Sequence, residues 1–471
     1  MRRTPGNGIE RSRYNSAMRT TVIILAAGQG KRMRSDLPKV LHPLAGRPLL
    51  QHVLASAAAL KPREIRVVHG HGGGQVQAAF LGQPIGWFHQ AVQKGTGHAV
   101  QQALPKIPAG DVALILYGDV PLVQPATLKK LVAKAAKGQV AVLTAVMANP
   151  AGYGRILRGE RGAVIAIVED KDATPQQRQL SEINTGLIAC PVGKLVKWIA
   201  RLKPNNAQKE YYLTDVIGLA VKDGVPVATV AAESEDEVLG INDKAQLAAA
   251  EKILRRRLAV GLMTAGVTLV DPERIDIRGE LVCGRDVVIE PDVIFEGVVH
   301  IGDGARIGAF TQIRNTLIGA GTVVHPHCLL EDGVIGPKCE IGPYARMRPG
   351  VEMAEGAKLG NFVEVKKSVI GRGSKVNHLS YIGDATIGDK VNVGAGTITC
   401  NYDGANKHRT VIGDGAFIGS GVELVAPVEI GPGATIGAGS TITKPAPAGQ
   451  LTIARSKQLS IPSWKRPVKG G

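Results

Sequence analysis

A turn of small residues near the amino-terminal end could bind phosphate. It reads L-A-A-G-Q-G-K-R-M over 25–33 and follows T-V-I-I-L-A-A, an apolar run typical of a buried strand. Backbone N–H groups in such a turn can approach phosphate oxygens closely, and Arg32 and Lys39 add positive charge. The spacing does not match the P-loop pattern G-x-x-x-x-G-K-[ST]. A turn shaped only by packing would have the same composition, so both interpretations stay open for this stretch by itself.

A second stretch could bind a metal ion. L-I-L-Y-G-D-V-P-L at 114–122 is an apolar strand that ends by delivering Asp119 to the carboxyl edge of a sheet. Ligands of α/β folds bind at this edge, and a carboxylate there suits Mg²⁺ beside nucleotide phosphates. The alternative is that Asp119 only begins the turn before Pro121.

His378, in H-L-S-Y-I-G-D, could act as a general base. A neutral imidazole can accept a proton near neutral pH, which acyl transfer to a protonated amine requires. His378 lies two positions after Val376, a member of a regular apolar series, and this spacing puts it off the core. The alternative, a solvated histidine on the surface, is our interpretation for His325, His327 and His408.

The elements that must position the first two stretches alternate between strand and helix over 20–260. Short apolar runs such as I-R-V-V-H and V-A-L-I-L-Y separate segments with helical spacing such as P-L-L-Q-H-V-L-A-S-A-A-A-L. This alternation is typical of a mostly parallel sheet covered on both faces. We therefore predict a Rossmann-like α/β nucleotidyltransferase domain over 18–242. A linker helix should follow at 243–262, which is rich in helix formers and free of proline.

From Cys283 onward the sequence follows a different period. Apolar or small residues recur six positions apart, in triplets that begin 17 or 18 residues apart, and Gly directly follows many of them. This period fits neither an amphipathic helix nor a simple hairpin. It fits a solenoid with three short strands per coil, each with one aliphatic residue pointing inward. We predict a left-handed parallel β-helix of hexapeptide repeats over 263–450, with corner glycines that supply backbone conformations other residues avoid.

The period is interrupted after Cys400 by N-Y-D-G-A-N-K-H-R. Triplets begin at 387 and 412, 25 positions apart, so seven or eight residues are surplus to the coil. They must project from a corner. There, a loop carrying Asn401, Tyr402 and Lys407 could wall a groove or reach an adjacent subunit.

Composition and charge narrow the class of protein. The chain has 471 residues with 44% apolar content and no run of 18 apolar residues, so we expect several globular domains and no membrane span. The net charge is +17, but aromatic residues are only 4%, which favours small polyanionic substrates over a base-stacking nucleic-acid surface. Part of the charge lies in residues 1–17 and part in a basic tail at 451–471. Either Met18 is the functional start, or residues 1–17 are a disordered extension. Five cysteines without metal-site spacing are expected to be reduced thiols in the cytoplasm.

Four motifs occur together and in order: L-A-A-G-x-G-x-R-M, L-P-K-V-L, G-T-G-H-A and Y-G-D-x-P-L. In this combination they resemble the sugar-nucleotide pyrophosphorylases. With H-L-S-Y-I-G-D and C-N-Y-D-G-A-N-K in a hexapeptide β-helix, the chain resembles one bacterial family over about 20–467. Its members are bifunctional N-acetylglucosamine-1-phosphate uridyltransferases and glucosamine-1-phosphate N-acetyltransferases.

The resemblance implies two reactions. The β-helix would acetylate glucosamine-1-phosphate with acetyl-CoA, and the first domain would transfer UMP from UTP to N-acetylglucosamine-1-phosphate with Mg²⁺, releasing pyrophosphate. The product would supply peptidoglycan and lipopolysaccharide synthesis, and the enzyme would be a cytoplasmic homotrimer. Two alternatives remain: a single-function sugar-1-phosphate nucleotidyltransferase with a structural β-helix, and a non-catalytic scaffold or regulator.

The resemblance also assigns the uridyltransferase site, motif by motif. Arg32 and Lys39 would be catalytic, through charge neutralisation at the phosphates, and Asp119 and Asn242 would bind Mg²⁺. The residues implied to bind UTP or the nucleotide sugar are Leu25, Ala26, Ala27, Gly28, Lys39, Gln90, Gly95, Thr96, Tyr117, Asp119, Gly154, Glu169, Asn184 and Asn242.

The acetyltransferase site is implied in the same way, with His378 as the base. The residues implied to bind the glucosamine phosphate are Arg348, Lys366, Tyr381 and Asn392. Those implied to line the acetyl-CoA site, three of them in the projecting loop, are Ala395, Asn401, Tyr402, Lys407, Ser420, Ala438 and Arg455. Trp464 and the basic tail could cover this site, although a solvated tail is the alternative.

Overall fold

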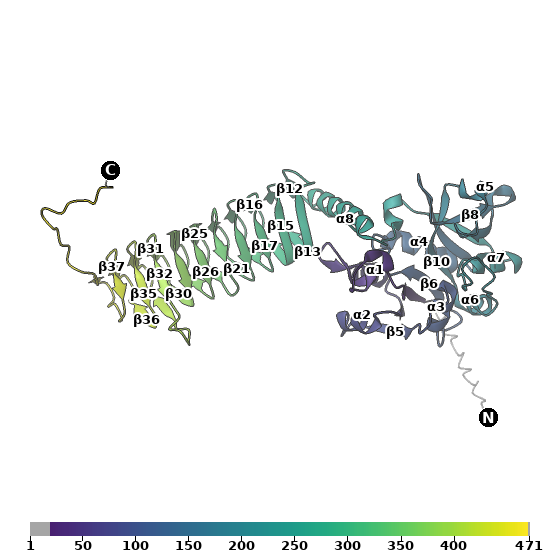
Figure 1. Ribbon diagram of the computed structural model, residues 1–471, viewed down its shortest axis with the longest axis horizontal. Coiled ribbons are helices and arrows are strands. Elements are labelled where there is room, and N and C mark those ends of the chain that lie inside the picture. The colour runs from purple at the N-terminus through teal and green to yellow at the C-terminus, as the bar shows by residue number, and fades with distance from the viewer. Residues whose placement is uncertain (1–18, 470–471) are drawn as a thin grey trace, which may run out of the picture. The chain divides into compact units, whose positions relative to one another are not determined.

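The computed structural model describes residues 19–469 and divides into two compact units between Ile253 and Leu254 (Figure 1). The predicted extension at 1–17 and Met18 lie outside the described residues. The first unit is built around a nine-stranded sheet and the second around two sheets of 11 and 17 strands.

The first unit is a mixed, mostly parallel sheet with the order β11-β7-β10-β6-β1-β4-β5. Only β10 runs against its neighbours β6 and β7, and it also pairs with the small β8–β9 hairpin. The strands are β1 (Thr20–Ala26), β4 (Glu64–His69), β5 (Ile85–His89), β6 (Val112–Tyr117), β7 (Val140–Val146), β8 (Gly154–Arg158), β9 (Val164–Val168), β10 (Glu182–Pro191) and β11 (Val227–Ala231).

Helices cover both faces of this sheet because its central strands are apolar on both sides. In β1, Val22 and Ile24 join the core under α1, α2 and α4, whereas Ile23 and Leu25 join the core under α3, α6 and α7. The predicted Rossmann-like arrangement is therefore confirmed. The helices are α1 (Leu49–Ala58), α2 (Gly73–Ala79), α3 (Thr96–Ala103), α4 (Pro125–Ala135), α5 (Pro175–Arg178), α6 (Val192–Ile199) and α7 (Asp215–Lys222).

A long helix, α8 (Lys244–Thr264), follows at the position predicted for the linker helix. The boundary between the two compact units falls inside it. Its C-terminal part contributes Ala259 to the core of the second unit.

The second unit is a parallel β-helix in which each coil presents three short strands. One face is the 11-stranded sheet, with strands β12 (Thr268–Leu269), β14 (Val288–Ile289), β16 (Arg306–Ile307), β19 (Val323–Val324), β22 (Glu340–Ile341), β25 (Lys358–Asn361), β28 (Lys375–His378), β31 (Asn392–Val393), β34 (Phe417–Ile418), β37 (Thr435–Ile436) and β39 (Leu451–Thr452). We call this face A.

The 17-stranded sheet wraps a corner and forms the other two faces. Its first strands, β13 (Ile275–Cys283) and β15 (Val293–Ile301), run across that corner. Face B continues with β17 (Gln312–Arg314), β20 (Leu329–Glu331), β23 (Arg346–Met347), β26 (Glu364–Lys366), β29 (Tyr381–Gly383), β32 (Ile398–Cys400), β35 (Glu423–Val425) and β38 (Thr441–Ile442). Face C continues with β18 (Leu317–Ile318), β21 (Val334–Ile335), β24 (Glu352–Met353), β27 (Val369–Ile370), β30 (Ala385–Ile387), β33 (Thr410–Ile412) and β36 (Val428–Ile430).

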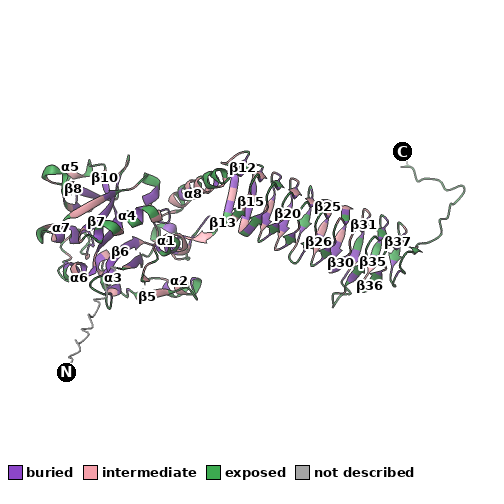
Figure 2. Cartoon of the chain, turned by 180° about the vertical axis from the view of Figure 1, so that it is seen from behind, coloured by how far each residue is buried: buried purple, intermediate pink, exposed green. Residues whose placement is uncertain are grey.

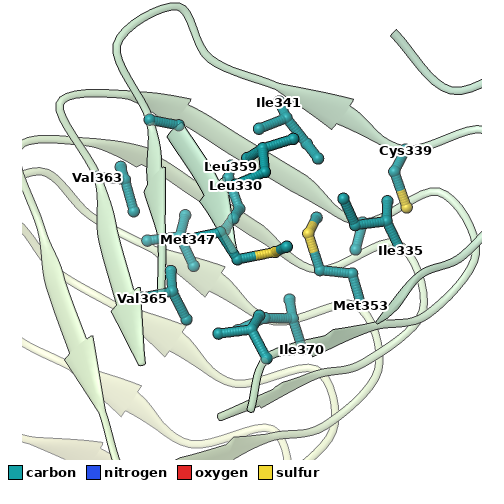
Figure 3. Close-up of a cluster of buried hydrophobic side chains, with 14 of the residues drawn as sticks. Leu330, Ile335, Cys339, Ile341, Met347, Met353, Leu359, Val363, Val365 and Ile370 are labelled. Carbon is teal, nitrogen blue, oxygen red and sulfur yellow. The ribbon is translucent and has the colours of Figure 1, made fainter. Parts of the chain in front are cut away.

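The interior of the solenoid is a continuous apolar core (Figures 2 and 3). Side chains such as Leu330, Ile341 and Met347 point inward from successive strands (Figure 3). Every residue of the six-residue series from Ile289 to Ile442 is buried, and only its first member, Cys283, is half-buried. The predicted hexapeptide β-helix is confirmed.

The role predicted for the glycines that follow the aliphatic residues is wrong for most of them. Gly302, Gly319 and Gly336 do not have positive φ. A Cβ on Gly302 would lie 2.6 Å from the backbone nitrogen of Ala320 in the next coil. Glycine is therefore required here because any side chain would prevent the coils from stacking closely. Positive φ is found instead at other corner residues, which include Phe310, His327, Tyr344 and Phe362.

The first coil could not be seen in the six-residue series. Val267, Leu269, Ile275 and Ile277 already belong to the solenoid core, before Cys283. Leu269 pairs with Ile289 and Ile277 pairs with Phe295, so these two residues hold successive inward positions. They are eight residues apart instead of six, with D-P-E-R and the start of the nine-residue β13 between them, and this hides the period.

The five cysteines are free thiols. Burial raises the pKa of Cys190 and of Cys283 to about 12, so both stay protonated near neutral pH.

Within residues 19–469, no helix combines the length and apolar character needed to cross a membrane.

Candidate functional sites

A cavity of about 290 Å³ opens at the carboxyl ends of β1 and β6. These strands are neighbours, with Leu25 opposite Tyr117, so the small-residue turn and the Y-G-D stretch meet at one edge of the sheet. The lining residues are Leu25, Ala26, Ala27, Gly28, Lys39, Val40, Gln90, Gln93, Gly95, Thr96, Ala99, Tyr117, Asp119 and Glu210. Most of the residues implied to bind the nucleotide therefore line a single cavity.

Gln90 is held so that its carbonyl oxygen remains for a ligand. Its Nε2 donates to the Gly95 carbonyl oxygen at 3.2 Å and lies 3.0 Å from His98 Nδ1. Burial, with a smaller contribution from Lys94, lowers the pKa of His98, which keeps a neutral ring that can accept this bond. Both amide hydrogens of Gln90 are thus used, and its oxygen can accept an N–H from a base edge.

Sequence reasoning missed Gln93, whose Nε2 donates to the Ala27 carbonyl oxygen at 3.3 Å. It lies three residues after Gln90 in Q-A-V-Q-K-G-T-G-H, and this repeated glutamine was the available signal.

Asp119 and Asn242 converge on one cation, the ammonium group of Lys39. Lys39 Nζ donates to Asp119 Oδ2 and, at 3.2 Å, to Asn242 Oδ1. A bond from the Ile241 N–H to the Asp119 carbonyl oxygen, at 2.9 Å, keeps Asn242 beside Asp119. A carboxylate and an amide oxygen around one cation are a donor set that suits Mg²⁺.

The rest of a metal coordination sphere would have to come from elsewhere. Among the described residues, no group of three or more His, Cys, Asp or Glu side chains is arranged to hold a metal ion. A Mg²⁺ site with few protein ligands is normally completed by substrate phosphates and water.

A second cavity, of about 240 Å³, shares Lys39 with the first. Its lining consists of Gly30, Lys31, Arg32, Lys39 and Asn242. Arg32 therefore lies apart from the cavity that holds Gln90, in a space with three cationic side chains that suits phosphate groups.

Gly154, Glu169 and Asn184 are brought together by the β8–β9 hairpin. Gly154 lies opposite Asn184 in the β8–β10 pairing, and Arg155 lies opposite Val168, which precedes Glu169. Asn184 is buried, and a Cβ on Gly154 would lie 3.4 Å from Glu169 Oε2, so the glycine leaves the carboxylate accessible.

Burial is the main cause that raises the pKa of Glu169, and the nearby Asp215, Asp172 and Asp170 carboxylates raise it further. Thr214, which sequence reasoning missed, opposes this shift because its hydroxyl donates to Glu169 Oε1 at 2.9 Å. Burial also raises the pKa of Tyr117, so its phenol remains a neutral donor at this end of the cavity.

His378 is the last residue of β28, at the corner between faces A and B. Its Nδ1 lies 2.6 Å from Asn361 Oδ1, a residue that sequence reasoning missed. An amide oxygen can only accept, so this bond requires the proton on Nδ1 and leaves the Nε2 lone pair free. The sequence signal for Asn361 was its position 17 residues before His378, which is the length of one coil. Residues one coil apart lie opposite each other, as Asn361 and His378 do in the pairing of β25 with β28.

The corner next to His378 continues as a column of small side chains. Ala395, Ser420 and Ala438 each follow an inward residue of face A by two positions, as His378 does. Their backbones are linked coil to coil, with Gly421 N–H bonded to Ala395 O at 2.7 Å and Gly439 N–H bonded to Ser420 O at 2.9 Å.

Arg455 lies at the far end of this column, where its Nη1 donates to the Ala438 carbonyl oxygen at 2.7 Å.

The adjacent corner column changes character at His378. Before it, the exposed rings of Phe310, His327, Tyr344 and Phe362 stack with centroids 4.8 to 5.2 Å apart. After Leu379 the same positions are glycines, at 396, 421 and 439. The corner is therefore bulky on one side of His378 and open on the other.

Cationic side chains gather on face B beside this corner. Lys366 ends β26, and Lys407 reaches it from the projecting loop. Contact with the Lys407 ammonium, followed by desolvation and the Lys407 and Arg348 charges, lowers the pKa of Lys366. Arg348 is paired with Glu364 at 3.0 Å, and the Asp384 charge opposes the shift of Lys366, so the two lysines are the main attraction for a phosphate dianion.

The interruption in the hexapeptide series forms a loop between β32 and β33, as predicted. Tyr402 pairs with Lys407 across it, and the Lys407 ammonium lies 5.8 Å from the Tyr402 ring centroid. Asp403, which sequence reasoning missed, accepts from the backbone N–H groups of Ala405 and Asn406 at 2.8 and 2.6 Å, and lies 2.6 Å from His408 Nε2. Asp403 therefore organises the loop that carries Tyr402 and Lys407.

Some residues implied for the acetyltransferase site are not brought together within one chain. Asn392 lies on face A, in β31, whereas Lys366 and Tyr381 lie on face B. Asn401 is buried and donates to Asp384 at 2.5 Å, so it anchors the loop. Trp464 lies in the tail and is 66% exposed.

Comparison with known proteins yields two family models, one in each unit. The MobA-like NTP transferase domain matches residues 22–184, and the bacterial transferase hexapeptide (six repeats) model matches residues 409–444. Three relatives share the whole architecture, each called bifunctional protein GlmU. They come from Aromatoleum aromaticum (59% identical, covering 95% of this chain and 98% of that protein), Azoarcus sp. (58%, 95% and 99%) and Chromobacterium violaceum (55%, 95% and 98%).

The chain belongs to the GlmU family. It is therefore a bifunctional enzyme with a nucleotidyltransferase domain and a hexapeptide-repeat transferase domain, as the sequence predicted. The GlmU likeness extends over nearly the whole chain, which disfavours a purely structural β-helix and a non-catalytic scaffold. The roles of individual residues remain predictions, although most of those implied for the nucleotide line one cavity.

Proposed function

We propose that the chain makes UDP-N-acetylglucosamine in two steps. The β-helix would acetylate glucosamine-1-phosphate with acetyl-CoA, and the first domain would then transfer UMP from UTP to the product, releasing pyrophosphate. The observation that carries this proposal is the pairing, in one GlmU-family chain, of a nucleotide-sized cavity ending at Asp119 with a His378 whose Nε2 is free.

In uridylyl transfer, the protein would mainly position reactants and neutralise charge. The Gln90 oxygen would accept an N–H from uracil, and Lys39 and Arg32 would hold phosphate oxygens. Mg²⁺, bound by Asp119 and Asn242, would supply further charge neutralisation. The sugar phosphate oxygen attacks the α-phosphorus, and the bond to the pyrophosphate oxygen breaks.

The acceptor sugar would lie against Gly154, Glu169 and Asn184. Glu169 is held by Thr214 at 2.9 Å, so its carboxylate can accept hydrogen bonds from sugar hydroxyls. The glycine provides room for the sugar beside this carboxylate.

In acetyl transfer, His378 Nε2 would take a proton from the amine of glucosamine-1-phosphate. The amine nitrogen then attacks the thioester carbonyl carbon, the C–S bond breaks, and the CoA sulfur leaves and is protonated. Arg348, Lys366 and Lys407 would hold the sugar phosphate, which also relieves the repulsion between the two lysines.

Acetyl-CoA would lie along the open part of the corner. The small side chains of Ala395, Ser420 and Ala438 leave room for an extended arm, and Arg455 at the end of the column suits the phosphates of the coenzyme.

We also propose a homotrimer of parallel β-helices, working in the cytoplasm, where acetyl-CoA and UTP are available. The exposed stack at Phe310, Tyr344 and Phe362 is an apolar stripe that a neighbouring chain could cover. The position of Asn392 on a different face supports a site shared between subunits.

The proposal is tested with purified chain, glucosamine-1-phosphate, acetyl-CoA, UTP and Mg²⁺. Free CoA and UDP-N-acetylglucosamine are measured in parallel, and each reaction is also run alone with its own acceptor. CoA release that does not depend on glucosamine-1-phosphate, or UTP consumption that does not depend on N-acetylglucosamine-1-phosphate, would contradict it. Sedimentation velocity checks the trimer.

A further inference from the structure

Lys39 occupies the position between the two oxygen atoms that suit a divalent cation. Its ammonium donates to Asp119 Oδ2 and to Asn242 Oδ1, the latter at 3.2 Å. The Lys39 and Asp119 side chains are only 13% and 18% exposed. The ammonium already occupies the position between these two oxygens, and a metal ion placed there as well would be repelled by its like charge.

The same residue lines two cavities. The larger, about 290 Å³, contains Gln90 and Thr96, which suit a base. The smaller, about 240 Å³, contains Lys31 and Arg32, which suit phosphates. Lys39 lines both, so a nucleoside triphosphate that extends from one into the other would bring its phosphates to the ammonium group.

The length of the lysine side chain allows such a movement. Gly30 has φ +61°, and a Cβ built on it would lie 2.8 Å from the Lys39 Cβ, so the glycine packs closely against the base of the side chain and not against its end. The ammonium is at the end of a four-carbon chain and can change partners without movement of the backbone.

We propose that Lys39 is a placeholder for the metal ion, an inference that rests on the proposed uridylyl transfer. In the ligand-free enzyme its ammonium neutralises Asp119 and blocks the metal position. Entry of the triphosphate gives the ammonium new anionic partners, and this frees Asp119 and Asn242. Metal and nucleotide therefore bind together, and metal binds poorly when the nucleotide is absent.

The test is a titration of the ligand-free chain with Mn²⁺, in which free ion is measured by electron paramagnetic resonance. Lys39→Met keeps the apolar stem and removes the ammonium. We expect this variant to bind Mn²⁺ at least about tenfold more tightly than the wild type without UTP, since loss of a competing charge-assisted bond changes an equilibrium constant by that order. Its uridylyl transfer should fall, because the phosphates lose a partner.

Lys31→Met is the matched control, since Lys31 is an exposed cation in the smaller cavity. It removes the same charge from the same region and should tighten Mn²⁺ binding by no more than about twofold, as expected for a screened, more distant charge. The double variant Lys39→Met with Asp119→Asn should lose the increase in Mn²⁺ affinity. That loss would show that the ion binds at Asp119.

Three results would overturn the placeholder: Mn²⁺ affinity that is unchanged or weaker in Lys39→Met, an equal gain in Lys31→Met, or a gain that survives the loss of Asp119. Thermal unfolding verifies that the variants are folded. Wild-type UDP-N-acetylglucosamine formation is measured on the same samples, so failure of the proposed function is recognised separately.

Discussion

The two candidate sites of this chain differ in how the fold makes room for a ligand. The nucleotide site is a cavity at the carboxyl edge of a sheet, where adjacent strands end and their loops diverge. The His378 site lies on an outer corner of a solenoid whose strands all point their apolar side chains inward. A corner is convex, so the solenoid adds a projecting loop and a column of small residues beside it.

Their charges differ as well. In the first site the ammonium of Lys39 is neutralised by Asp119. In the second, the Lys407 ammonium lowers the pKa of Lys366, as expected for two like charges near each other. The first site would exchange the Lys39 ammonium for a metal ion, whereas the second would attract the phosphate of the sugar.

The largest expected effect separates the two sites. Asp119→Ala should abolish uridylyl transfer and leave acetyl transfer intact, because Asp119 lies in the first unit only. His378→Ala should lower acetyl transfer by roughly 10²–10⁴-fold, the usual contribution of a general base, and leave uridylyl transfer intact. Each variant is assayed for CoA release and for nucleotide-sugar formation.

Circular dichroism and thermal unfolding are the controls for this pair. Parallel loss of both activities in a folded Asp119→Ala variant would argue against independent sites.

The next effect concerns the orientation of His378. Asn361→Ala should lower acetyl-transfer kcat by about 10–100-fold, since the imidazole loses the partner that fixes its tautomer. The KM for acetyl-CoA should change little. Asn361→Asp, which keeps an acceptor for Nδ1–H, should recover part of the activity and move the acid limb of the pH–rate profile upward, because a carboxylate raises the pKa of a neighbouring imidazole. An unchanged pH profile in Asn361→Asp would contradict this role.

A single substitution in the projecting loop should have a smaller effect than loss of the Asn361 contact, whereas removal of the whole loop should not. Asp403→Ala should raise the KM for glucosamine-1-phosphate by about tenfold, because loss of hydrogen bonds to a charged group disorders the loop carrying Lys407. Asp403→Asn keeps an acceptor oxygen and should have a smaller effect. Deletion of 401–408, which restores the repeat, should leave a folded solenoid without acetyl transfer, and persistent activity would refute the role of the loop.

The smallest effect is a pH shift in the first unit. The Thr214 hydroxyl stabilises the charged form of Glu169, whose pKa is raised mainly by burial. Thr214→Val should raise that pKa further, so the KM for the sugar phosphate should begin to increase at a higher pH as the solution is made more acidic. A shift within about one pH unit is expected from loss of one hydrogen bond. Glu169→Gln should remove this pH dependence.

Much of the architecture could be predicted because it is local in sequence. One inward side chain per short strand imposes a six-residue period, and the buried series from Ile289 to Ile442 follows it. The α/β unit could also be predicted, because the alternation of apolar strands with helices is a local pattern in the sequence. The first coil was missed because the long β13 and the D-P-E-R segment hide the period there.

The contacts around the candidate sites were less accessible to sequence reasoning. Asn361 and His378 are paired only through the stacking of coils, and the glycines after the aliphatic residues are explained by the approach of the next coil. Asn401 belongs to a recognisable loop motif, yet its side chain is buried as an anchor.

The sequence by itself determined which residues face the interior of the solenoid and which motifs end at the carboxyl edge of the sheet, because both follow from the periodicity of single strands. The tertiary structure decided which outward residues share a corner and that Lys39 lies between Asp119 and Asn242. Those contacts depend on the stacking of coils and on loops that return from distant positions in the chain, and no local period encodes either.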